Sequence, residues 1–398
     1  MGFRLVAIAV VLVLIAGCSR PSAESSTPAS APSSPSSPHG TITPGRTRPS
    51  TSLTAPSGPT CEALATAMPL AGRIGQLFMI GVSSAASPSK ATGVIRTTSA
   101  GSVLLIGASD AGVEKTAAIT AAIRAAAPGT IVATDQEGGK VQRLRGPGFD
   151  RMPTAMVQSQ MPVEVLSEAA ATWGSQLAAA GVLYDLAPVA DVVPVANRGT
   201  NAPIGALDRG YGSDPEVVSS SLTAFIAGMH AGGVEVSLKH FPGLGEVTDN
   251  TDKAPATDTV TTRGTSSTTF RAGIAAGAGS VMVSSAIYSQ IDPGIQGVFS
   301  KVIITDMLRG DLRFTGVVIS DDLGLAQAVA SITPGDRALR FLVAGGDLVI
   351  NSEPSIQSAM TAAVTQRAKT QPDFAARVIQ SAARVLRLKA SVGAVRCQ

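Results

Sequence analysis

Acidic and basic side chains recur in this sequence directly after short apolar runs. Asp135, Asp191 and Asp321 each stand at or just after the end of such a run, and Lys239 and His240 stand together at the end of another. A carboxylate can serve as a nucleophile or carry a proton, and a lysine beside a neutral histidine can donate several hydrogen bonds to hydroxyl groups. One aspartate at a strand end could merely cap the following helix. Several polar strand ends together predict a shared pocket.

Eight apolar runs supply the elements that must position these side chains, and Ala-rich helical stretches alternate with them. Their near-continuous hydrophobicity is typical of parallel strands covered on both sides. The runs are Leu77–Val82, Ser102–Gly107, Thr130–Asp135, Val182–Val189, Glu235–His240, Ser280–Ala286, Gly316–Asp321 and Leu348–Asn351. We predict an α/β fold, a (β/α)₈ TIM-like barrel, in which the strand ends converge on one face. A doubly wound open sheet is the alternative, although no Gly-x-Gly-x-x-Gly follows the first run.

Composition sets the class of protein. With 398 residues, 44% of them hydrophobic, the chain can bury a sizeable core and is not intrinsically disordered. Its 31 Lys and Arg residues are scattered and only 4% of residues are aromatic, so no nucleic-acid partner is expected. Neither a His/Cys ligand spacing nor a phosphate-binding loop is present, so we expect no metal or organic cofactor.

The first residues have the layout of a secretory signal. Arg4 precedes an apolar run over residues 5–15 that is too short to span a bilayer, and Ala16, Gly17 and Cys18 follow. Residues 15–18 resemble a bacterial lipobox, so we predict a signal peptide over 1–17 and lipidation of Cys18. An ordinary signal peptide that removes Cys18 is the alternative. The lipid would anchor the protein to the outer face of the cytoplasmic membrane or cell envelope.

A Ser-, Pro- and Thr-rich segment follows the predicted lipidation site. Residues 18–60 contain almost no bulky apolar side chains, so we predict a disordered tether that leads to one catalytic domain over 61–398. Cys61 and Cys397 stand at the two ends of that domain, and export would permit a disulfide between them. Two unpaired cysteines are the alternative.

Five segments, in the same order, resemble motifs of glycoside hydrolase family 3, in particular its bacterial β-N-acetylglucosaminidase branch. Lys239-His240-Phe241-Pro242-Gly243-Leu244-Gly245 resembles the signature Lys-His-Phe-Pro-Gly-x-Gly. The other four are residues 135–143 (DQEGGKVQR), 187–192 (APVADV), 209–215 (RGYGSDP) and 314–323 (FTGVVISDDL). The resemblance covers about residues 61–398. It implies a retaining, exo-acting glycosidase whose substrate is a glycan that carries a terminal amino sugar.

The resemblance also assigns roles to individual residues. It implies that Asp321 is the nucleophile, and an ionised carboxylate at the end of a rigid buried strand suits that role. Asp322, the next residue, is expected to cap a helix. The sugar-binding positions of the family fall on Asp135 as an acceptor and on Arg143, Arg209, Lys239 and His240 as donors. For the two arginines, a structural salt bridge is the alternative.

The proton donor is where this chain departs from the family pattern. The branch carries Gly-His-Gly and then Asp-Ser-His, whose Asp–His pair is the general acid/base; here the corresponding residues are Gly243-Leu244-Gly245 and Asn250-Thr251-Asp252. Of the chain's three histidines, none occupies the expected position. A carboxylic acid can take over the role if burial and a negative neighbour raise its pKa. We predict Asp252 as the acid, ahead of Asp249 and Glu246, each of which could instead be a solvated loop residue.

Three alternative functions are compatible with these residues and with the resemblance. The first is a β-N-acetylglucosaminidase, acting as a monomer on peptidoglycan-derived or related glycans. The second is a different specificity on the same barrel, such as β-glucosidase. The third is a non-catalytic glycan-binding lipoprotein that retains Asp321 without an acid.

Overall fold

The computed structural model describes residues 58–265 and 267–398. The predicted signal peptide, the predicted lipidation site Cys18 and nearly all of the predicted tether lie outside the described residues. Among the helices that are described, none combines the length and apolar character needed to cross a membrane.

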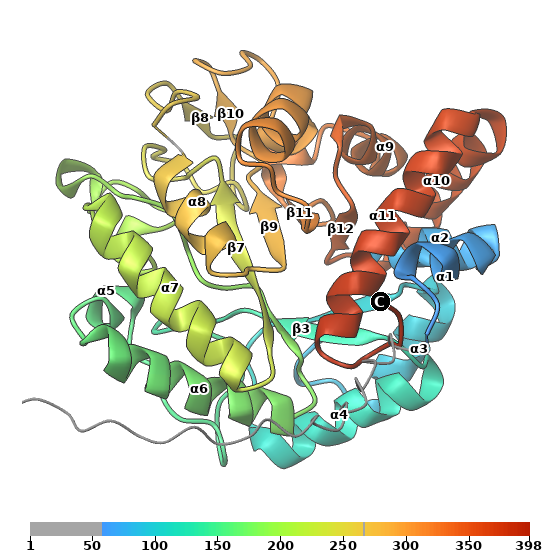
Figure 1. Ribbon diagram of the computed structural model, residues 1–398, viewed down its shortest axis with the longest axis horizontal. Coiled ribbons are helices and arrows are strands. Elements are labelled where there is room, and N and C mark those ends of the chain that lie inside the picture. The colour runs from blue at the N-terminus through green and yellow to red at the C-terminus, as the bar shows by residue number, and fades with distance from the viewer. Residues whose placement is uncertain (1–57, 266) are drawn as a thin grey trace, which may run out of the picture. The chain divides into compact units, whose positions relative to one another are not determined.

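Eight parallel strands close into a barrel in which each strand pairs with its neighbours in chain order (Figure 1). They are β1 (Phe78–Ser83), β2 (Ser102–Ile106), β3 (Ile131–Thr134), β6 (Tyr184–Asp185), β7 (Glu235–Phe241), β9 (Ser280–Val283), β11 (Val317–Asp322) and β12 (Leu348–Asn351). Pairing of β1 with β12, with Phe78 opposite Val349, completes the circle. Each strand overlaps one of the eight predicted apolar runs. The predicted (β/α)₈ barrel is confirmed, and the open sheet is wrong.

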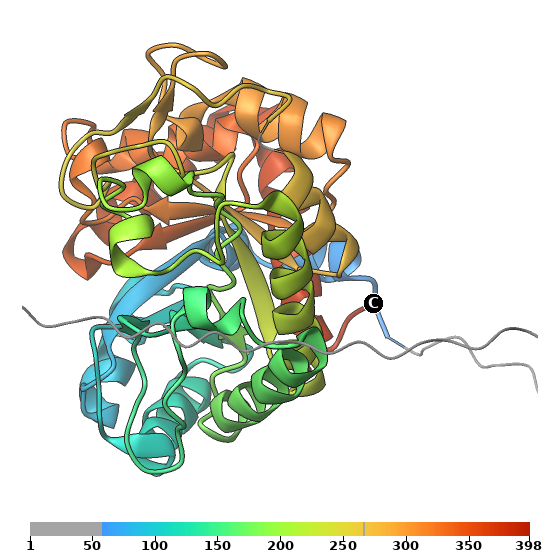
Figure 2. The same cartoon turned by 90° about the vertical axis from the view of Figure 1, so that its left-hand side faces the viewer.

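Helices surround the strands, as Figure 2 shows from a second direction. They are α1 (Cys61–Ala67), α2 (Leu70–Gln76), α3 (Pro88–Thr98), α4 (Gly112–Ala126), α5 (Ala155–Gln158), α6 (Val163–Ala179), α7 (Pro215–Ala231), α8 (Ser267–Ala275), α9 (Pro334–Ala344), α10 (Gln357–Thr370), α11 (Pro372–Ser391) and the π-helical segment η4 (Val302–Asp311). Start signals are visible in the sequence. Asp214 accepts a hydrogen bond from the Glu216 amide, and Pro215 is the first residue of α7.

Helix α11 closes the barrel at the amino ends of the strands. Two of its residues, Val385 and Leu388, belong to an apolar cluster inside the barrel. The same cluster contains the first residues of β3, β11 and β12, namely Ile131, Val317 and Leu348. Because this end is filled with apolar side chains, a polar ligand has access to the barrel interior only from the carboxyl ends of the strands.

A buried aspartate ties α11 to the barrel. Asp347, directly before β12, pairs with Arg309, with Arg377 at 3.0 Å and with Arg384 at 3.2 Å. It also accepts hydrogen bonds from the Val318 amide at 3.0 Å and from a serine of α11. Burial alone would raise the pKa of Asp347, but the three guanidiniums lower it.

Replacement of Asp347 by Ala is expected to lower the free energy of unfolding by about 3–5 kcal/mol, because three partly buried guanidiniums lose the one carboxylate that pairs with them among the described residues. The measurement is urea unfolding of the wild type and the variant. Asp373→Ala, which removes an exposed aspartate of the same helix, should change stability by less than about 1 kcal/mol. Since the pKa is lowered in the folded state, this stabilisation is present above the unfolded pKa and lost as the pH falls. Equal effects of the two substitutions would contradict this role.

The two ends of the described chain are joined. Cys61 and Cys397 form a disulfide across a sequence separation of 336 residues, with Cα atoms 4.9 Å apart. The Cys61 amide also donates to the Gln398 carbonyl at 2.9 Å. The pairing predicted from the sequence is therefore present in the structure, and it connects α1 to the segment that follows α11.

Candidate active site

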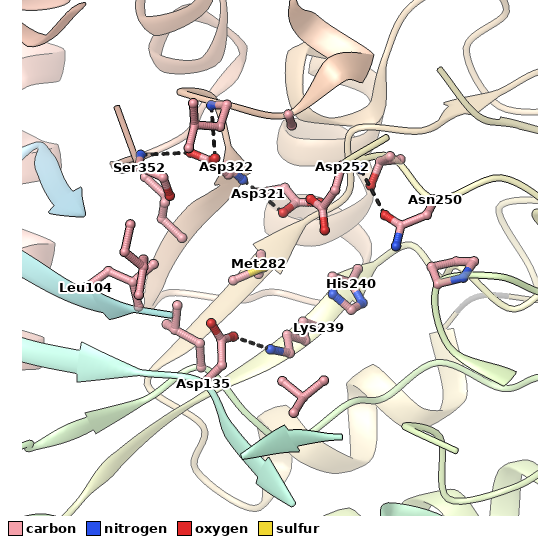
Figure 3. A pocket seen from close by; sticks show the side chains of 18 of the residues that line it. Leu104, Asp135, Lys239, His240, Asn250, Asp252, Met282, Asp321, Asp322 and Ser352 are labelled. Carbon is pink, nitrogen blue, oxygen red and sulfur yellow. Dashed lines mark hydrogen bonds and ion pairs between the residues drawn. The ribbon is translucent and has the colours of Figure 1, made fainter. Parts of the chain in front are cut away.

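A cavity of about 360 Å³ opens at the carboxyl ends of the barrel strands. The buried floor of the cavity is apolar and includes Leu104 and Met282, from β2 and β9 (Figure 3), and Ile350 from β12. All seven residues predicted for catalysis or sugar binding line this cavity, namely Asp135, Arg143, Arg209, Lys239, His240, Asp252 and Asp321. Residues up to 186 positions apart in the chain thus meet because parallel strands end on one face of a barrel.

Asp321 is the second-last residue of β11, near the carboxyl end of the strand. The first four residues of this strand are buried, whereas the last two, Asp321 and Asp322, are half-buried. One Asp321 carboxylate oxygen, Oδ1, accepts a hydrogen bond from the Asp322 amide at 2.9 Å. Burial, together with the negative charge of Asp252, raises the pKa of Asp321 to about 6, while His240 opposes the shift. The predicted nucleophile therefore has a second carboxylate beside it.

Asp252 is held next to Asp321 by backbone contacts. Its amide donates to the Asn250 side-chain oxygen at 2.9 Å, and its carbonyl accepts from the Gln327 amide at 3.2 Å. The neighbouring Thr251 carbonyl accepts from the Ala328 amide at 3.1 Å. Gln327 and Ala328 follow the nucleophile strand, so these bonds join the loop that carries Asp252 to the segment that follows Asp321.

The other two candidate acids lie elsewhere. The Glu246 carboxylate accepts a hydrogen bond from Asn197 Nδ2 at 2.7 Å and lines a different, smaller cavity. Asp249 and Asp252 are both exposed, so the burial expected for the acid is absent, but Asp252 lines the cavity that contains Asp321 and Asp249 does not. Of the three acids considered from the sequence, Asp252 is the one that the structure brings to Asp321.

The raised pKa of Asp321 predicts an acid limit to activity. A nucleophilic carboxylate must be ionised, so kcat/KM for a nitrophenyl β-N-acetylglucosaminide should fall about tenfold per pH unit below pH 6. Asp252→Asn removes the negative neighbour and should move this limb to lower pH. The measurement is the pH profile of kcat/KM for both proteins. A limb that stays in place would show that Asp252 does not influence the nucleophile.

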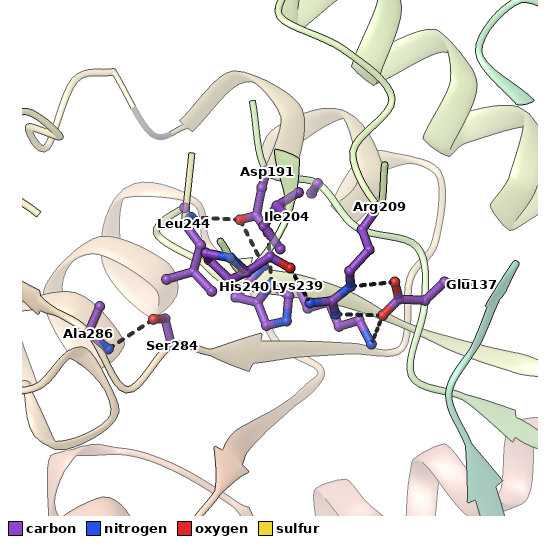
Figure 4. Close-up of polar contacts among 12 residues, drawn as sticks. Glu137, Asp191, Ile204, Arg209, Lys239, His240, Leu244, Ser284 and Ala286 are labelled. Atoms are coloured by element: carbon purple, nitrogen blue, oxygen red, sulfur yellow. Dashed lines mark hydrogen bonds and ion pairs between the residues drawn. The ribbon is translucent and has the colours of Figure 1, made fainter. Parts of the chain in front are cut away.

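One buried carboxylate holds two of the predicted sugar-binding cations (Figure 4). Glu137, in the short strand β4 (Gln136–Gly138), accepts from Lys239 Nζ at 2.6 Å and from Arg209 Nη2 at 2.7 Å through Oε1. Its Oε2 accepts from Arg209 Nε at 2.8 Å. Burial would raise the pKa of Glu137, but Arg209 and Lys239 lower it well below its usual range. Both cations are thereby held in place before any ligand arrives.

Hydrogen-bond capacity remains for a ligand. Lys239 Nζ also donates to Asp135 Oδ1 at 2.7 Å, which leaves one of its three N–H groups and the second Asp135 oxygen. Arg209 donates its third bond to the Pro203 carbonyl at 2.8 Å, so two of its five N–H groups remain. The salt-bridge alternative for Arg209 is therefore present in the structure, and Arg209 lines the cavity as well.

His240 is oriented by a second buried carboxylate. Its Nδ1 lies 2.7 Å from Asp191 Oδ2, and its amide donates to Asp191 Oδ1 at 3.1 Å. The same Oδ1 accepts from the Leu244 amide at 2.8 Å. With Nδ1 engaged by Asp191, the other ring nitrogen of His240 is the one available to a ligand.

Arg143 differs from the other cations of the cavity. Its backbone is fixed, since its amide donates to the Asp135 carbonyl at 3.3 Å and its carbonyl accepts from the Ser109 amide at 2.9 Å. The residue is only partly exposed, and within the described part of the chain its guanidinium makes no hydrogen bond or ion pair. The salt bridge considered for Arg143 as an alternative is therefore absent among the described residues.

The structure corrects one expectation and adds two residues. Asp322 does not cap a helix: it accepts from the Gly324 and Leu325 amides and from the Ser352 amide, at 2.9, 3.0 and 2.9 Å, which ties the turn after β11 to the end of β12. Sequence reasoning gave no role to Glu137 and noted Asp191 only as a polar strand end. Both lie inside recognised motifs, but their partners lie 49–102 residues away, so nothing local reveals the contacts.

Comparisons with known proteins identify the family to which this chain belongs. Residues 70–388 match the family described as "Glycosyl hydrolase family 3 N terminal domain". A β-hexosaminidase of Stenotrophomonas maltophilia is 37% identical over 249 residues, which are 60% of this chain and 72% of the relative. A β-hexosaminidase of Xanthomonas oryzae is 37% identical over 264 residues, 63% of this chain and 76% of the relative.

Two solved structures are similar in fold. The β-N-acetylhexosaminidase of Beutenbergia cavernae superposes with a TM-score of 0.79 at 47% identity, covering 81% of this chain and 99% of that one. A family 3 β-N-acetylglucosaminidase of Paenibacillus superposes with a TM-score of 0.75 at 26% identity, covering 82% of this chain and 63% of that one.

Proposed function

Since this chain belongs to glycosyl hydrolase family 3, we propose that its β-N-acetylglucosaminidase reaction retains configuration and proceeds through a covalent bond between C1 of the sugar and Asp321. The observation that carries the proposal is the pair of carboxyl groups, Asp321 and Asp252, at one cavity that is also lined by Asp135, Lys239 and His240. A retaining glycosidase needs one carboxylate to attack C1 and one proton donor for the leaving oxygen.

In the first step, an ionised Asp321 attacks C1 while Asp252, as a carboxylic acid, gives its proton to the glycosidic oxygen. The bond from C1 to the leaving oxygen breaks, the bond from C1 to Asp321 forms, and the leaving group departs as an alcohol. In the second step, the Asp252 carboxylate takes a proton from water as the water oxygen attacks C1 and releases Asp321.

The sugar is held by the remaining polar groups. Asp135 accepts hydrogen bonds from hydroxyls, and Arg143, Arg209, Lys239 and His240 donate to them. Glu137 holds Arg209 and Lys239, and Asp191 holds His240, so these three donors need little reorganisation on binding. A cavity of about 360 Å³ suits one sugar ring, which supports an exo-acting enzyme that removes terminal N-acetylglucosamine.

The origin of the substrate and the location of the enzyme form the second part of the proposal. We propose that the chain is exported, that Cys18 is lipidated, and that residues 18–60 tether a monomeric enzyme at the outer face of the membrane, where it acts on peptidoglycan-derived glycans. The support is the signal and lipobox pattern of residues 1–18 and a disulfide of the kind that an oxidising compartment permits. Incorporation of a labelled fatty acid that is lost in Cys18→Ala would test the anchor.

The covalent step is tested by trapping. A 5-fluoro N-acetylglucosaminyl fluoride forms the glycosyl-enzyme but slows its hydrolysis, so the modified peptide can be identified by mass spectrometry. We expect the label on Asp321. A label on any other residue, or inversion of configuration in the product, would overturn the mechanism.

A further inference from the structure

Leu325 is the one large apolar side chain that is exposed among those lining the catalytic cavity, within the described residues. Its exposed fraction is 52%, whereas Leu104, Met282 and Ile350, on the cavity floor, are 2–4% exposed. A single exposed leucine on a protein surface requires no explanation. This one lies at the mouth of an active site, where it is available to a bound ligand.

The backbone of Leu325 is fixed by the residue that follows the nucleophile. The Leu325 amide donates to Asp322 Oδ2 at 3.0 Å, and Asp322 Oδ1 accepts from the Gly324 and Ser352 amides. A Cβ atom at Gly324 would lie 2.5 Å from Asn351 Oδ1, so this turn packs tightly against the end of β12. Leu325 is therefore presented at the mouth by a turn with little freedom to move.

Leu325 lies in the segment that connects the two proposed catalytic carboxylates. Leu325 lies three positions after Asp322, and two positions after Leu325 the Gln327 amide donates to the Asp252 carbonyl at 3.2 Å. The segment 322–327 thus begins directly after Asp321 and ends at the residue that is bonded to Asp252. In Figure 3, Asp135 and Lys239 lie across the cavity from Asp322 and Ser352, so the sugar-binding groups occupy the other side.

Two other large apolar side chains of the lining, Ile106 and Leu207, are half-buried, and among the large apolar side chains of the described residues that line the cavity Leu325 alone is exposed. Glycan-binding sites commonly use aromatic rings as apolar faces, yet no Phe, Tyr or Trp is among the described residues that line the cavity. We propose that Leu325 is a specificity-determining residue that contacts the apolar portion of the leaving group. This inference rests on the proposed function, because it requires the sugar to occupy the site formed by Asp135 and Lys239.

The test compares two ligands that differ only in apolar length beyond the glycosidic atom. Methyl and hexyl 1-thio-β-N-acetylglucosaminides resist hydrolysis, and their Kd values can be measured by calorimetry with the full-length protein. The wild type should bind the hexyl compound more tightly. Leu325→Ala should reduce that preference by about threefold to tenfold, and leave the Kd of the methyl compound unchanged.

Two further variants separate this role from a general effect. Leu325→Met keeps the apolar volume and should keep the preference, while Val343→Ala, which shortens a side chain 50% exposed on α9 and outside the cavity, should change neither Kd. A hexyl preference that is absent from the wild type, or unchanged in Leu325→Ala, would overturn the inference. Hydrolysis of the nitrophenyl substrate, measured in parallel, tests the proposed function separately, because a failure there leaves the binding comparison intact.

Discussion

Asp321→Ala is expected to lower kcat/KM for nitrophenyl β-N-acetylglucosaminide by about 10⁴-fold or more, since the substitution removes the atom that bonds to C1. Addition of azide should restore part of the activity, because a small anion can enter the space left by the carboxylate and attack C1 from the same face. The product would then be an α-glycosyl azide, identified by nuclear magnetic resonance.

Stability provides the control for this variant. The pKa of Asp321 is raised in the folded protein to about 6, so its ionised form is disfavoured by folding at neutral pH. Removal of the carboxylate should therefore leave the free energy of unfolding the same or higher at pH 7, as is common for residues that serve catalysis at the expense of stability. An inactive variant that is also strongly destabilised would point to a structural role for Asp321 instead.

Asp252→Ala is expected to separate substrates by the acidity of their leaving group. A nitrophenolate leaves with little help, so kcat/KM for the nitrophenyl glycoside should fall less than about tenfold. The methyl glycoside needs a proton on its leaving oxygen, and its kcat/KM should fall by about 10²–10⁴-fold. Steady-state rates on the two substrates measure the difference directly.

A matched variant exists on the same loop. Asp249→Ala removes an exposed carboxylate three residues away that does not line the cavity, and it should leave both rates within about twofold of the wild type. Equal losses on both substrates in Asp252→Ala would remove Asp252 as the acid. A loss confined to the methyl glycoside in Asp249→Ala would transfer the role to Asp249.

The eight strands could be predicted because the information for each is local. A parallel strand covered on both faces is apolar at nearly every position, as in β3, where all four residues are buried. Closure into a barrel then brings the ends of β7 and β11 to one face without further information. The predicted boundaries differ from the observed ones mainly where a run continues into a loop, as after β6 and β9.

The acid could not be decided in the same way. Glu246, Asp249 and Asp252 lie within seven residues of one another and are chemically similar. Which of them lies next to Asp321 depends on the path of the loop. That path is set by hydrogen bonds from the Ala328 and Gln327 amides, more than 70 residues later in the sequence, to the Thr251 and Asp252 carbonyls. No local pattern encodes such a contact.

Asp321 could be predicted as the candidate nucleophile from the sequence, because an acidic residue at the end of a buried strand and the motif around it are both local features. Its surroundings were decided by tertiary structure alone. Only the closed barrel brings Asp252 close enough to raise the pKa of Asp321 and brings Glu137 between Arg209 and Lys239. Charges interact strongly over a few ångströms in a desolvated site, and such distances between remote segments exist only once the chain has folded.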